Sequence, residues 1–436
     1  MKDHSPVFLI ATILLLSSFA AAQAYSVVNI GNGSPRALSS TASVAGVFET
    51  TKKPRQTHAF FWSKSGGFQD LGTLGGNGDD SAAFGVNSSD QVVGQANAAP
   101  GAPDQAFLWS ASTGMVDLGN LGGASSFATA INASAEVAGQ SELASAFTNG
   151  FFWSSGAGLQ SIGTLPSGQQ SGANAINSSG EIAGWANVNT NDVAVIWSNA
   201  DGLSNLGIAA KCGSTAFGIN DSQEVVGWYN ESASCAFKSH GFSWTESGGT
   251  IDLGVLPGAQ FSFAYGVNGS GQIVGTGDNS TSSIVALLWT ANGAPQDLNT
   301  LISAKSTRTL VSANAINDAG QIVADATAKN GSGHFVVLLT PIMNTTLASS
   351  LNPSQSGQQV TFTATVQSIA GVPPDGEQVA FYSGATLLGN GSLAQGSASF
   401  TTSSLAVGTH KIFAEYTGDA TYASSKSAIL TQVVTK

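Results

Sequence analysis

A tryptophan-terminated segment that recurs every 44 to 47 residues constrains the fold of this chain more than any other feature. Each copy contains four short segments of strand character, separated by Gly, Ser, Asn or Asp. A period of about 45 residues with four short strands is typical of one blade of a β-propeller. The sequence therefore predicts an all-β ring of blades over residues 25–341. The repeated segments end at Trp62, Trp109, Trp153, Trp197, Trp244 and Trp289.

The order of the segments predicts how the ring closes. In most units the first segment ends in Asn, the second in Gly, the third in Trp, and the fourth carries a sequence such as Asp-Leu-Gly. The first copy ends its first segment in Ser39, and the last copy has Ala324 and Leu338 in place of Gly and Trp. The last copy lacks a fourth segment, and one stands instead near the start of the chain, at Val27–Gly31. A closed ring explains this displacement, whereas an open solenoid would leave an unpaired edge at each end. We therefore expect a seven-bladed β-propeller in which the N-terminal strand closes the last blade.

Two residues of the repeat have expected structural roles. The Asn that ends the first segment opens a tight turn, which its side chain can cap, and a ligand role is the weaker alternative. The recurring Trp is expected in the core, because large aromatic side chains supply the buried area of thin units.

The pattern changes from Asn344 onward. Six short alternating segments follow, separated by turn signals such as Pro373–Gly376 and Thr417–Asp419. Residues 344–436 are therefore expected to form an immunoglobulin-type (Ig-like) β-sandwich without its disulfide. The expected strands are residues 345–351, 359–366, 378–382, 398–402, 410–416 and 428–434.

The first 24 residues resemble a targeting segment rather than part of the fold. Lys2 precedes an apolar run from Val7 to Ala22, and Ala22-Gln23-Ala24 is a suitable cleavage site. Residues 1–24 are thus predicted to be a secretory signal peptide, with an uncleaved signal anchor as the alternative. No later stretch approaches the ~18 apolar residues of a membrane helix. We expect a secreted or cell-surface protein with no membrane span in the mature chain.

Charge excludes two classes of partner. The chain has 14 Lys and Arg against 26 Asp and Glu, a net charge of −12, and no basic cluster. Binding to nucleic acid or to anionic membranes is therefore not expected.

Two family resemblances follow from short motifs. His58-Ala59-Phe60, followed by Phe61-Trp62, and the run Asp70–Gly76 resemble bacterial extracellular HAF-repeat proteins, over most of the mature chain up to about Thr340. This resemblance implies no activity, because the family is known by its repeats. Gln359–Ala364 and Tyr416–Ala420 resemble bacterial Ig-like repeat domains, which implies a spacer or an adhesive module.

Motifs for catalysis are not found. The sequence has no G-x-S-x-G, H-E-x-x-H or phosphate-binding loop. His58, His240 and His334 share one repeat position, which favours a structural role over metal ligation. Asp79-Asp80 is too weak a pattern for a cation site. No catalytic, cofactor-binding or metal-binding residues are expected. The recurring Asp of the fourth segment is expected to satisfy backbone groups at Asp70, Asp117, Asp252 and Asp297.

The two cysteines are expected to form a disulfide in an exported chain. Cys212 lies between a fourth segment and the next first segment, and Cys235 lies between the second and third segments of that next unit. In a propeller both loops lie on one face, so the pair can bond.

Two classes of function remain open. The first is a non-enzymatic binding or adhesion protein that recognises an extracellular carbohydrate or a surface protein, and the alternative is an extracellular polysaccharide hydrolase or lyase. Recognition is expected in loops of variable sequence on one face. Trp185 and Trp228 approach that face and are the candidate ligand platform, with packing between blades as the alternative. The variable loops between second and third segments are residues 96–104, 141–148, 186–192, 229–239 and 277–283.

Overall fold

Antiparallel strands make up nearly all of the regular structure. The computed structural model describes residues 23–51, 56–74, 80–232, 238–290, 293–419 and 422–436. Within these ranges there is no α-helix, and a 3-10 turn, η2, spans Leu298–Thr300. Among the described residues, then, no helix has the length and apolar character needed to cross a membrane. The predicted signal peptide, residues 1–24, lies almost wholly outside the described residues.

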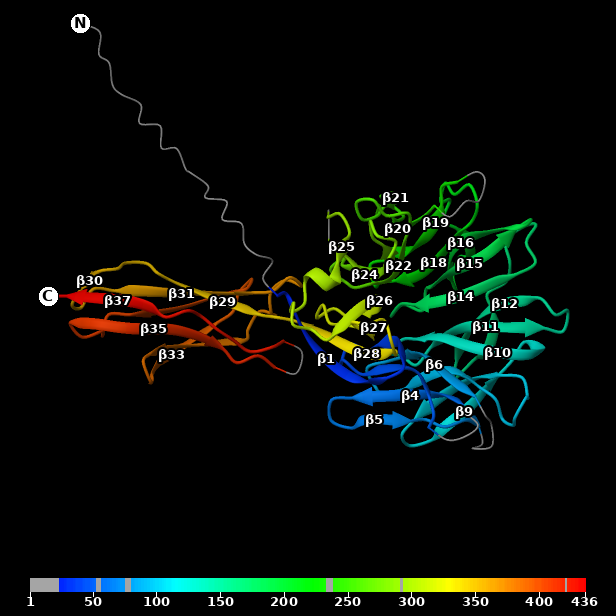
Figure 1. Ribbon diagram of the computed structural model, residues 1–436, viewed down its shortest axis with the longest axis horizontal. Coiled ribbons are helices and arrows are strands. Elements are labelled where there is room, and N and C mark those ends of the chain that lie inside the picture. The colour runs from blue at the N-terminus through cyan, green and yellow to red at the C-terminus, as the bar shows by residue number, and fades with distance from the viewer. Residues whose placement is uncertain (1–22, 52–55, 75–79, 233–237, 291–292, 420–421) are drawn as a thin grey trace, which may run out of the picture.

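Seven four-stranded antiparallel sheets occupy the larger part of the chain (Figure 1). We number them sheets 1 to 7 in chain order. Sheets 1 to 3 comprise β2(Ser34–Leu38), β3(Val44–Glu49), β4(Thr57–Ser63) and β5(Gly67–Asp70); β6(Ser81–Val86), β7(Val92–Ala96), β8(Gln105–Ser110) and β9(Gly114–Gly119); and β10(Gly122–Ile131), β11(Val137–Leu143), β12(Thr148–Ser154) and β13(Gly158–Ser161). Sheets 4 and 5 comprise β14(Ser171–Ile176), β15(Ile182–Val188), β16(Asn191–Ser198) and β17(Gly202–Asn205); and β18(Ser214–Ile219), β19(Val225–Asn230), β20(Ser239–Thr245) and β21(Gly249–Asp252). Sheets 6 and 7 comprise β22(Ser262–Val267), β23(Ile273–Asp278), β24(Ile284–Trp289) and β25(Gln296–Asp297); and β26(Arg308–Ile316), β27(Ile322–Ala328), β28(Phe335–Pro341) and β1(Tyr25–Asn32).

The seventh sheet joins the two ends of this region. β1 pairs antiparallel with β28, with Tyr25 opposite Pro341 and Asn32 opposite Phe335. The first strand of each sheet lies beside the first strand of the next sheet, and β2 of sheet 1 lies beside β26 of sheet 7. The order of neighbouring sheets therefore closes on itself, and the first strands surround a common centre.

A ring of asparagines ties neighbouring sheets together at the turns after the first strands. The Asn132 Oδ1 accepts the backbone N–H groups of Ser134 and Glu136, at 3.0 and 2.9 Å, which confirms the predicted turn role. Its Nδ2 also donates to the carbonyl oxygen of Asn177 in the next sheet, at 3.0 Å, a bond that the sequence analysis missed. We call these residues the turn ring: Asn87, Asn132, Asn177, Asn220, Asn268 and Asn317, with Ser39 accepting from Asn317.

Serines link the sheets at the opposite end of the first strands. Ser126 accepts the backbone N–H of Ala106 at 2.9 Å and donates to the carbonyl oxygen of Gly119 at 2.6 Å, both in the preceding sheet. Sheets 2 to 6 are thus hydrogen-bonded to a neighbouring sheet at both ends of their first strands. Serines at the equivalent position in other sheets accept in the same way: Ser81, Ser171, Ser214 and Ser262.

Aromatic side chains fill the space between sheets. Trp109, Trp197 and Trp289 are buried, while the other three repeat tryptophans are half-buried and pack against other core clusters of the ring. The Gly that ends the second segment permits close pairing, because a Cβ on Gly94 would collide with the carbonyl oxygen of Ala82.

Residues from 344 onward form two further sheets at one end of the molecule (Figure 1). Phe362, Phe381 and Tyr416 pack between the two sheets. The sequence analysis missed β33, which contains Gly389, where a Cβ would collide with the ring of Phe400. One sheet contains β29(Asn344–Ser349), β31(Val360–Gln367) and β34(Ser397–Thr402). The other contains β30(Ser354–Gln355), β37(Leu430–Thr435), β35(Gly408–Tyr416), β32(Gln378–Ser383), β33(Thr386–Ser392) and β36(Ser425–Lys426).

Candidate ligand-binding channel

A β-bulge interrupts the first strand of every sheet of the ring. In sheet 2 the pairing of β6 with β7 shifts between Ala83 and Gly85, which leaves Phe84 unpaired. Bulges redirect a side chain that regular pairing would hold in the sheet. We call the seven bulged residues the bulge ring: Arg36, Phe84, Thr129, Asn174, Phe217, Tyr265 and Asn314.

All seven side chains of the bulge ring line the central channel. They border a cavity of about 390 Å³, together with Ser312, and a second cavity of about 240 Å³. Ser312 precedes the bulge of its strand, whereas the smaller cavity is lined by the two residues that follow each bulge. The bulge ring therefore divides the channel into a wider part near the start of the first strands and a narrower part near the turn ring.

The chemistry of the bulge ring is mixed, although the seven strands are alike. Arg36 is its one charged side chain, and it is exposed. Phe217 and Tyr265 make an edge-to-face contact, with ring centroids 5.6 Å apart. Burial raises the pKa of the Tyr265 phenol, and the nearby Arg36 guanidinium partly opposes that shift. A positive charge, a phenol and aromatic surface thus share one channel.

The neutral polar members of the bulge ring are held by hydrogen bonds to the neighbouring sheet. Asn174 Nδ2 donates to the carbonyl oxygen of Ala216 at 2.8 Å, and Thr129 Oγ1 donates to that of Ala173 at 2.8 Å. Asn314 Nδ2 donates to the carbonyl oxygen of Pro35 at 2.6 Å. These bonds fix the channel wall, so its shape is preorganised for a ligand.

Sequence reasoning missed the bulge ring, although a signal for it was present. Each bulged residue comes three positions before the turn-ring residue, as Phe84 does before Asn87. The intervening residues are small and aliphatic in every copy, while the bulged position changes from Arg to aromatic to amide. A position that varies inside a constant motif was the available clue.

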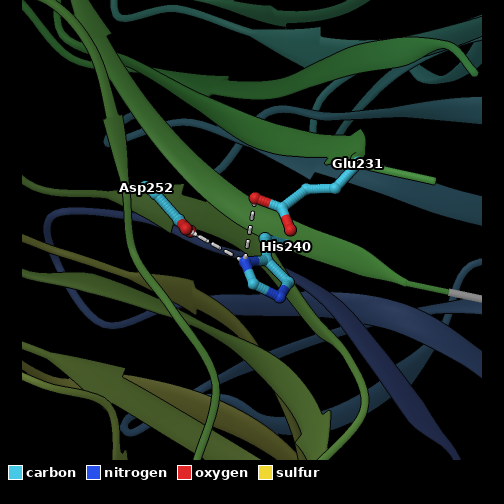
Figure 2. Close-up of side chains that lie close together, drawn as sticks. All are labelled: Glu231, His240 and Asp252. Carbon is cyan, nitrogen blue, oxygen red and sulfur yellow. Dashed lines mark hydrogen bonds and ion pairs between the residues drawn. The ribbon is translucent and has the colours of Figure 1, made fainter. Parts of the chain in front are cut away.

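The repeat histidines pair with carboxylates, and Figure 2 shows the pair of sheet 5. His240 Nδ1 lies 3.0 Å from one Asp252 oxygen and 3.9 Å from Glu231 Oε1. Asp252 also accepts the backbone N–H of Gly254 at 2.8 Å. These three side chains are close enough together to hold a cation. The His240 nitrogen that faces the carboxylates is, however, already hydrogen-bonded to Asp252, so the arrangement is that of a structural pair.

The same pairing in other sheets supports this structural interpretation. His58 Nδ1 lies 2.8 Å from Asp70 Oδ1, and Asp70 accepts from the N–H of Gly72. His334 lies 3.3 Å from Asp325 instead, because β1 offers Asn29 in place of the repeat Asp. The predicted role of the repeat aspartates in satisfying backbone groups is confirmed at four positions: Asp70, Asp117, Asp252 and Asp297.

The two tryptophans of the candidate platform are half-buried, and each packs on its surroundings. Trp228 meets Phe263 of sheet 6 edge to face, with centroids 5.8 Å apart. Trp185 covers Gly172 of its own sheet, where a Cβ would collide with the indole. The Trp228 contact is what the alternative of packing between blades expects, whereas the Trp185 contact lies within one sheet. A ligand platform stays a prediction.

The predicted long loops are shorter in two sheets. Half of the predicted loop at residues 141–148 is strand, because β11 and β12 continue pairing to Glu142 and Thr148. The predicted loop at 186–192 is a tight hairpin for the same reason, since Val188 pairs with Asn191.

The cysteine and paired-aspartate predictions fall partly outside the described residues. Cys212 is disulfide-bonded, while Cys235 lies in residues 233–237, outside the described part, so the pairing stays a prediction. Asp79 lies outside it too, and Asp80 Oδ1 accepts the backbone N–H of Thr57 at 3.1 Å.

Comparison with known proteins identifies the C-terminal domain. Residues 347–435 match the bacterial Ig-like domain (group 3), so this domain is Ig-like, as predicted. No curated protein matches the chain.

Similar solved structures are all remote. They include TolB from Acinetobacter baumannii, with a TM-score of 0.36, 11% identity and coverage of 52% of this chain and 53% of TolB. The gluconolactonase XC5397 from Xanthomonas campestris has a TM-score of 0.33 and 9% identity, with 74% of this chain and 92% of the enzyme covered. The extracellular domain of BT4673 from B. thetaiotaomicron has a TM-score of 0.37 and 9% identity, with 94% and 58% covered. The chain thus spans about half the length of TolB, and the neighbours include both an extracellular domain and an enzyme.

Proposed function

We propose that this chain is an exported, non-enzymatic binding protein. Its ring of sheets is a seven-bladed β-propeller of HAF-repeat type that holds an extracellular ligand in the central channel. The Ig-like domain spaces the propeller from a surface or attaches it there. The observation that carries the proposal is the bulge ring. Its seven strands have the same geometry but present chemically different side chains to one channel.

Folding alone does not explain the variety of the bulge ring. The turn ring and the serine bonds repeat because each blade needs the same link to its neighbour. Three of the bulged side chains also donate to the neighbouring sheet: Thr129, Asn174 and Asn314. The charged and aromatic members of the bulge ring make no such bond within the described residues, so their identity is free to serve recognition. A rigid scaffold with a few differing polar groups in a concave site is typical of ligand binding.

The lining of the channel favours binding over hydrolysis or lyase chemistry. Its titratable groups among the described residues are Arg36 and Tyr265. Glycoside hydrolysis uses a pair of carboxyl groups that flank the scissile bond. The proposal therefore assigns the channel to ligand retention, and a polysaccharide-degrading enzyme is the alternative to be tested.

Binding of the mature chain, residues 25–436, to a glycan array and to isolated cell walls tests this proposal. Phe217→Ala removes a ring from the channel, and Phe147→Ala removes an exposed ring from a hairpin outside it. We expect Phe217→Ala to abolish binding and Phe147→Ala to leave it unchanged. Equal binding by both variants places the ligand elsewhere, and release of reducing ends or unsaturated products from a bound glycan establishes an enzyme instead.

A further inference from the structure

We infer, resting on the proposed binding in the channel, that the ligand carries a carboxylate and that Arg36 binds it. The ligand class is an acidic saccharide that presents a uronic acid to the wider part of the channel. Arg36 is then the residue that distinguishes this ligand from neutral sugars.

Arg36 is held at the channel wall but has no protein partner for its charge. Its strand is fixed by the Asn314 bond to the Pro35 carbonyl oxygen, at 2.6 Å, and by Ser34 Oγ, which donates to Asp325 at 3.0 Å. Within the described residues, the Arg36 guanidinium makes no hydrogen bond or ion pair with a protein group. Asp325 is already occupied by Ser34 and by His334.

The Arg36 guanidinium lies close to the Tyr265 phenol in the wider cavity, and no carboxylate among the described residues pairs with it. A planar guanidinium matches the two oxygens of a carboxylate, and the attraction is stronger in a partly closed channel than in open water.

Carboxylates lie at some of the turns beside the narrower side of the channel. Glu136 and Glu181 accept hydrogen bonds from Asn132 and Asn177 of the turn ring. Glu224 occupies the same position in sheet 5, whereas three other sheets carry Gln there. The three carboxylates of sheets 3 to 5 disfavour an anion on that side.

The rest of the lining suits a sugar better than a simple organic acid. Ser312, Thr129 and Asn174 offer hydroxyl and amide groups for ligand hydroxyls, and Phe84 and Phe217 offer apolar surface for the C–H face of a pyranose ring. The cavity of about 390 Å³ lies within the range of roughly 300–1,000 Å³ found for small-molecule sites. An acid without hydroxyl groups would leave these polar groups unused.

Titration calorimetry of the mature chain with D-galacturonate and D-glucuronate tests the inference, with D-galactose and D-glucose as neutral counterparts. We expect at least one uronate to bind more tightly than its neutral counterpart. Because a hydrogen-bonded charge pair is lost, Arg36→Gln should weaken uronate binding about tenfold to hundredfold, and Arg36→Lys should recover part of it. Arg308→Gln is the matched control, since Arg308 lies over the Phe335 ring, outside this cavity, and it should bind as the unmodified chain does.

The outcomes separate this inference from the function on which it rests. Equal binding of uronates and neutral sugars, unchanged in Arg36→Gln but lost in Phe217→Ala, overturns the carboxylate assignment and retains the channel. Preference for a sugar phosphate or sulfate over both uronates overturns the uronic acid class. Binding that survives Phe217→Ala overturns the channel itself, and with it this inference.

Discussion

Each turn-ring residue follows a bulge-ring residue by three positions, in the turn after the same first strand. The two rings nevertheless differ in burial, in residue type and in hydrogen bonding. Turn-ring side chains are buried, nearly identical, and bonded both to their own turn and to the next sheet. Bulge-ring side chains are half-buried or exposed and of several chemical kinds. The difference fits the proposed function, in which the turn ring stabilises the fold and the bulge ring binds the ligand.

Physical chemistry explains why the two rings diverge. A buried amide that loses its partner costs about 1–3 kcal/mol, and six of the seven sheets keep Asn there, with Ser39 in sheet 1. The charged and aromatic side chains of the bulge ring make no hydrogen bond within the described residues, so changing them imposes no such cost. Variation at the bulge is therefore free to follow a ligand. Changes to the closing strand, the disulfide, the two tryptophans and one residue of each ring test this difference between the rings, from the largest expected loss of stability to the smallest.

Removing the closing strand should have the largest effect. Deleting residues 25–31 removes most of β1, exposes the edge of β28 and takes away the fully buried Tyr25. We expect a loss of more than about 5 kcal/mol, a large part of the typical stability of a domain. Thermal melting measures it, with Val28→Ala, at an exposed position of β1, as the control. Melting of the truncated chain at the temperature of the mature chain contradicts a closed ring.

The predicted disulfide should have the next largest effect. If Cys212 pairs with Cys235, the bond joins two loops of sheet 5 without touching either ring, and Cys212→Ser should lower stability by about 3 kcal/mol. Channel binding should not change. Mass spectrometry of unreduced digests identifies the pairing, and a Cys235 thiol found free in exported protein rules it out.

Much of the scaffold could be predicted from the sequence, because repeats expose their rules by repetition. The third-segment tryptophans, the turn role of Asn132 and the displaced segment that became β1 all follow from the pattern. The bond from Asn132 to the next sheet could not be foreseen, since it depends on how two sheets approach each other.

The candidate site was harder to predict for a related reason. A β-bulge leaves no consistent residue type in the sequence, because the bulged residue has no partner to satisfy. Arg36 stands in the most degenerate copy of the first segment, so the repeat pattern does not mark its position. The size of Trp185 and Trp228 predicts a ligand platform instead, whereas Trp228 packs on Phe263 in the structure.

Replacing Trp185 and Trp228 with Ala tests whether these residues belong with the stabilising or the recognising parts. Trp228 should stabilise the contact between two sheets, as the turn ring does, because it contacts Phe263 of the next sheet. We expect each replacement to lower stability by about 2–3 kcal/mol, less than for a fully buried aromatic residue, and binding to persist. Denaturant unfolding and the glycan array measure the two effects. Lost binding at unchanged stability establishes the platform instead.

Removing one member of the turn ring should cost less. Asn268 caps its turn and donates to the carbonyl oxygen of Asn317 at 3.1 Å. Asn268→Ala removes one of the two donors to that carbonyl oxygen, which also accepts from the Gly320 N–H, and it takes the acceptor from the Gln272 N–H. We therefore expect a loss of about 1–2 kcal/mol in the free energy of unfolding. Ligand affinity should stay the same. A variant as stable as the parent removes the turn ring from the stabilising elements.

The bulge-ring residue of the same strand provides the matched comparison and the smallest effect. Tyr265→Phe keeps the ring that contacts Phe217 and removes only the hydroxyl group, which lies in the channel near Arg36. Because no described protein group is hydrogen-bonded to this hydroxyl, stability should change by less than about 0.5 kcal/mol, as at ordinary surface positions. Affinity for the channel ligand should fall by about fivefold to tenfold, the value of one hydrogen bond.

The contrast between the two rings requires Asn268→Ala to lower stability without affecting affinity. It requires Tyr265→Phe to lower affinity without affecting stability. If both variants lower stability and affinity together, the two rings act as one structural unit, and the separation of stability from recognition fails.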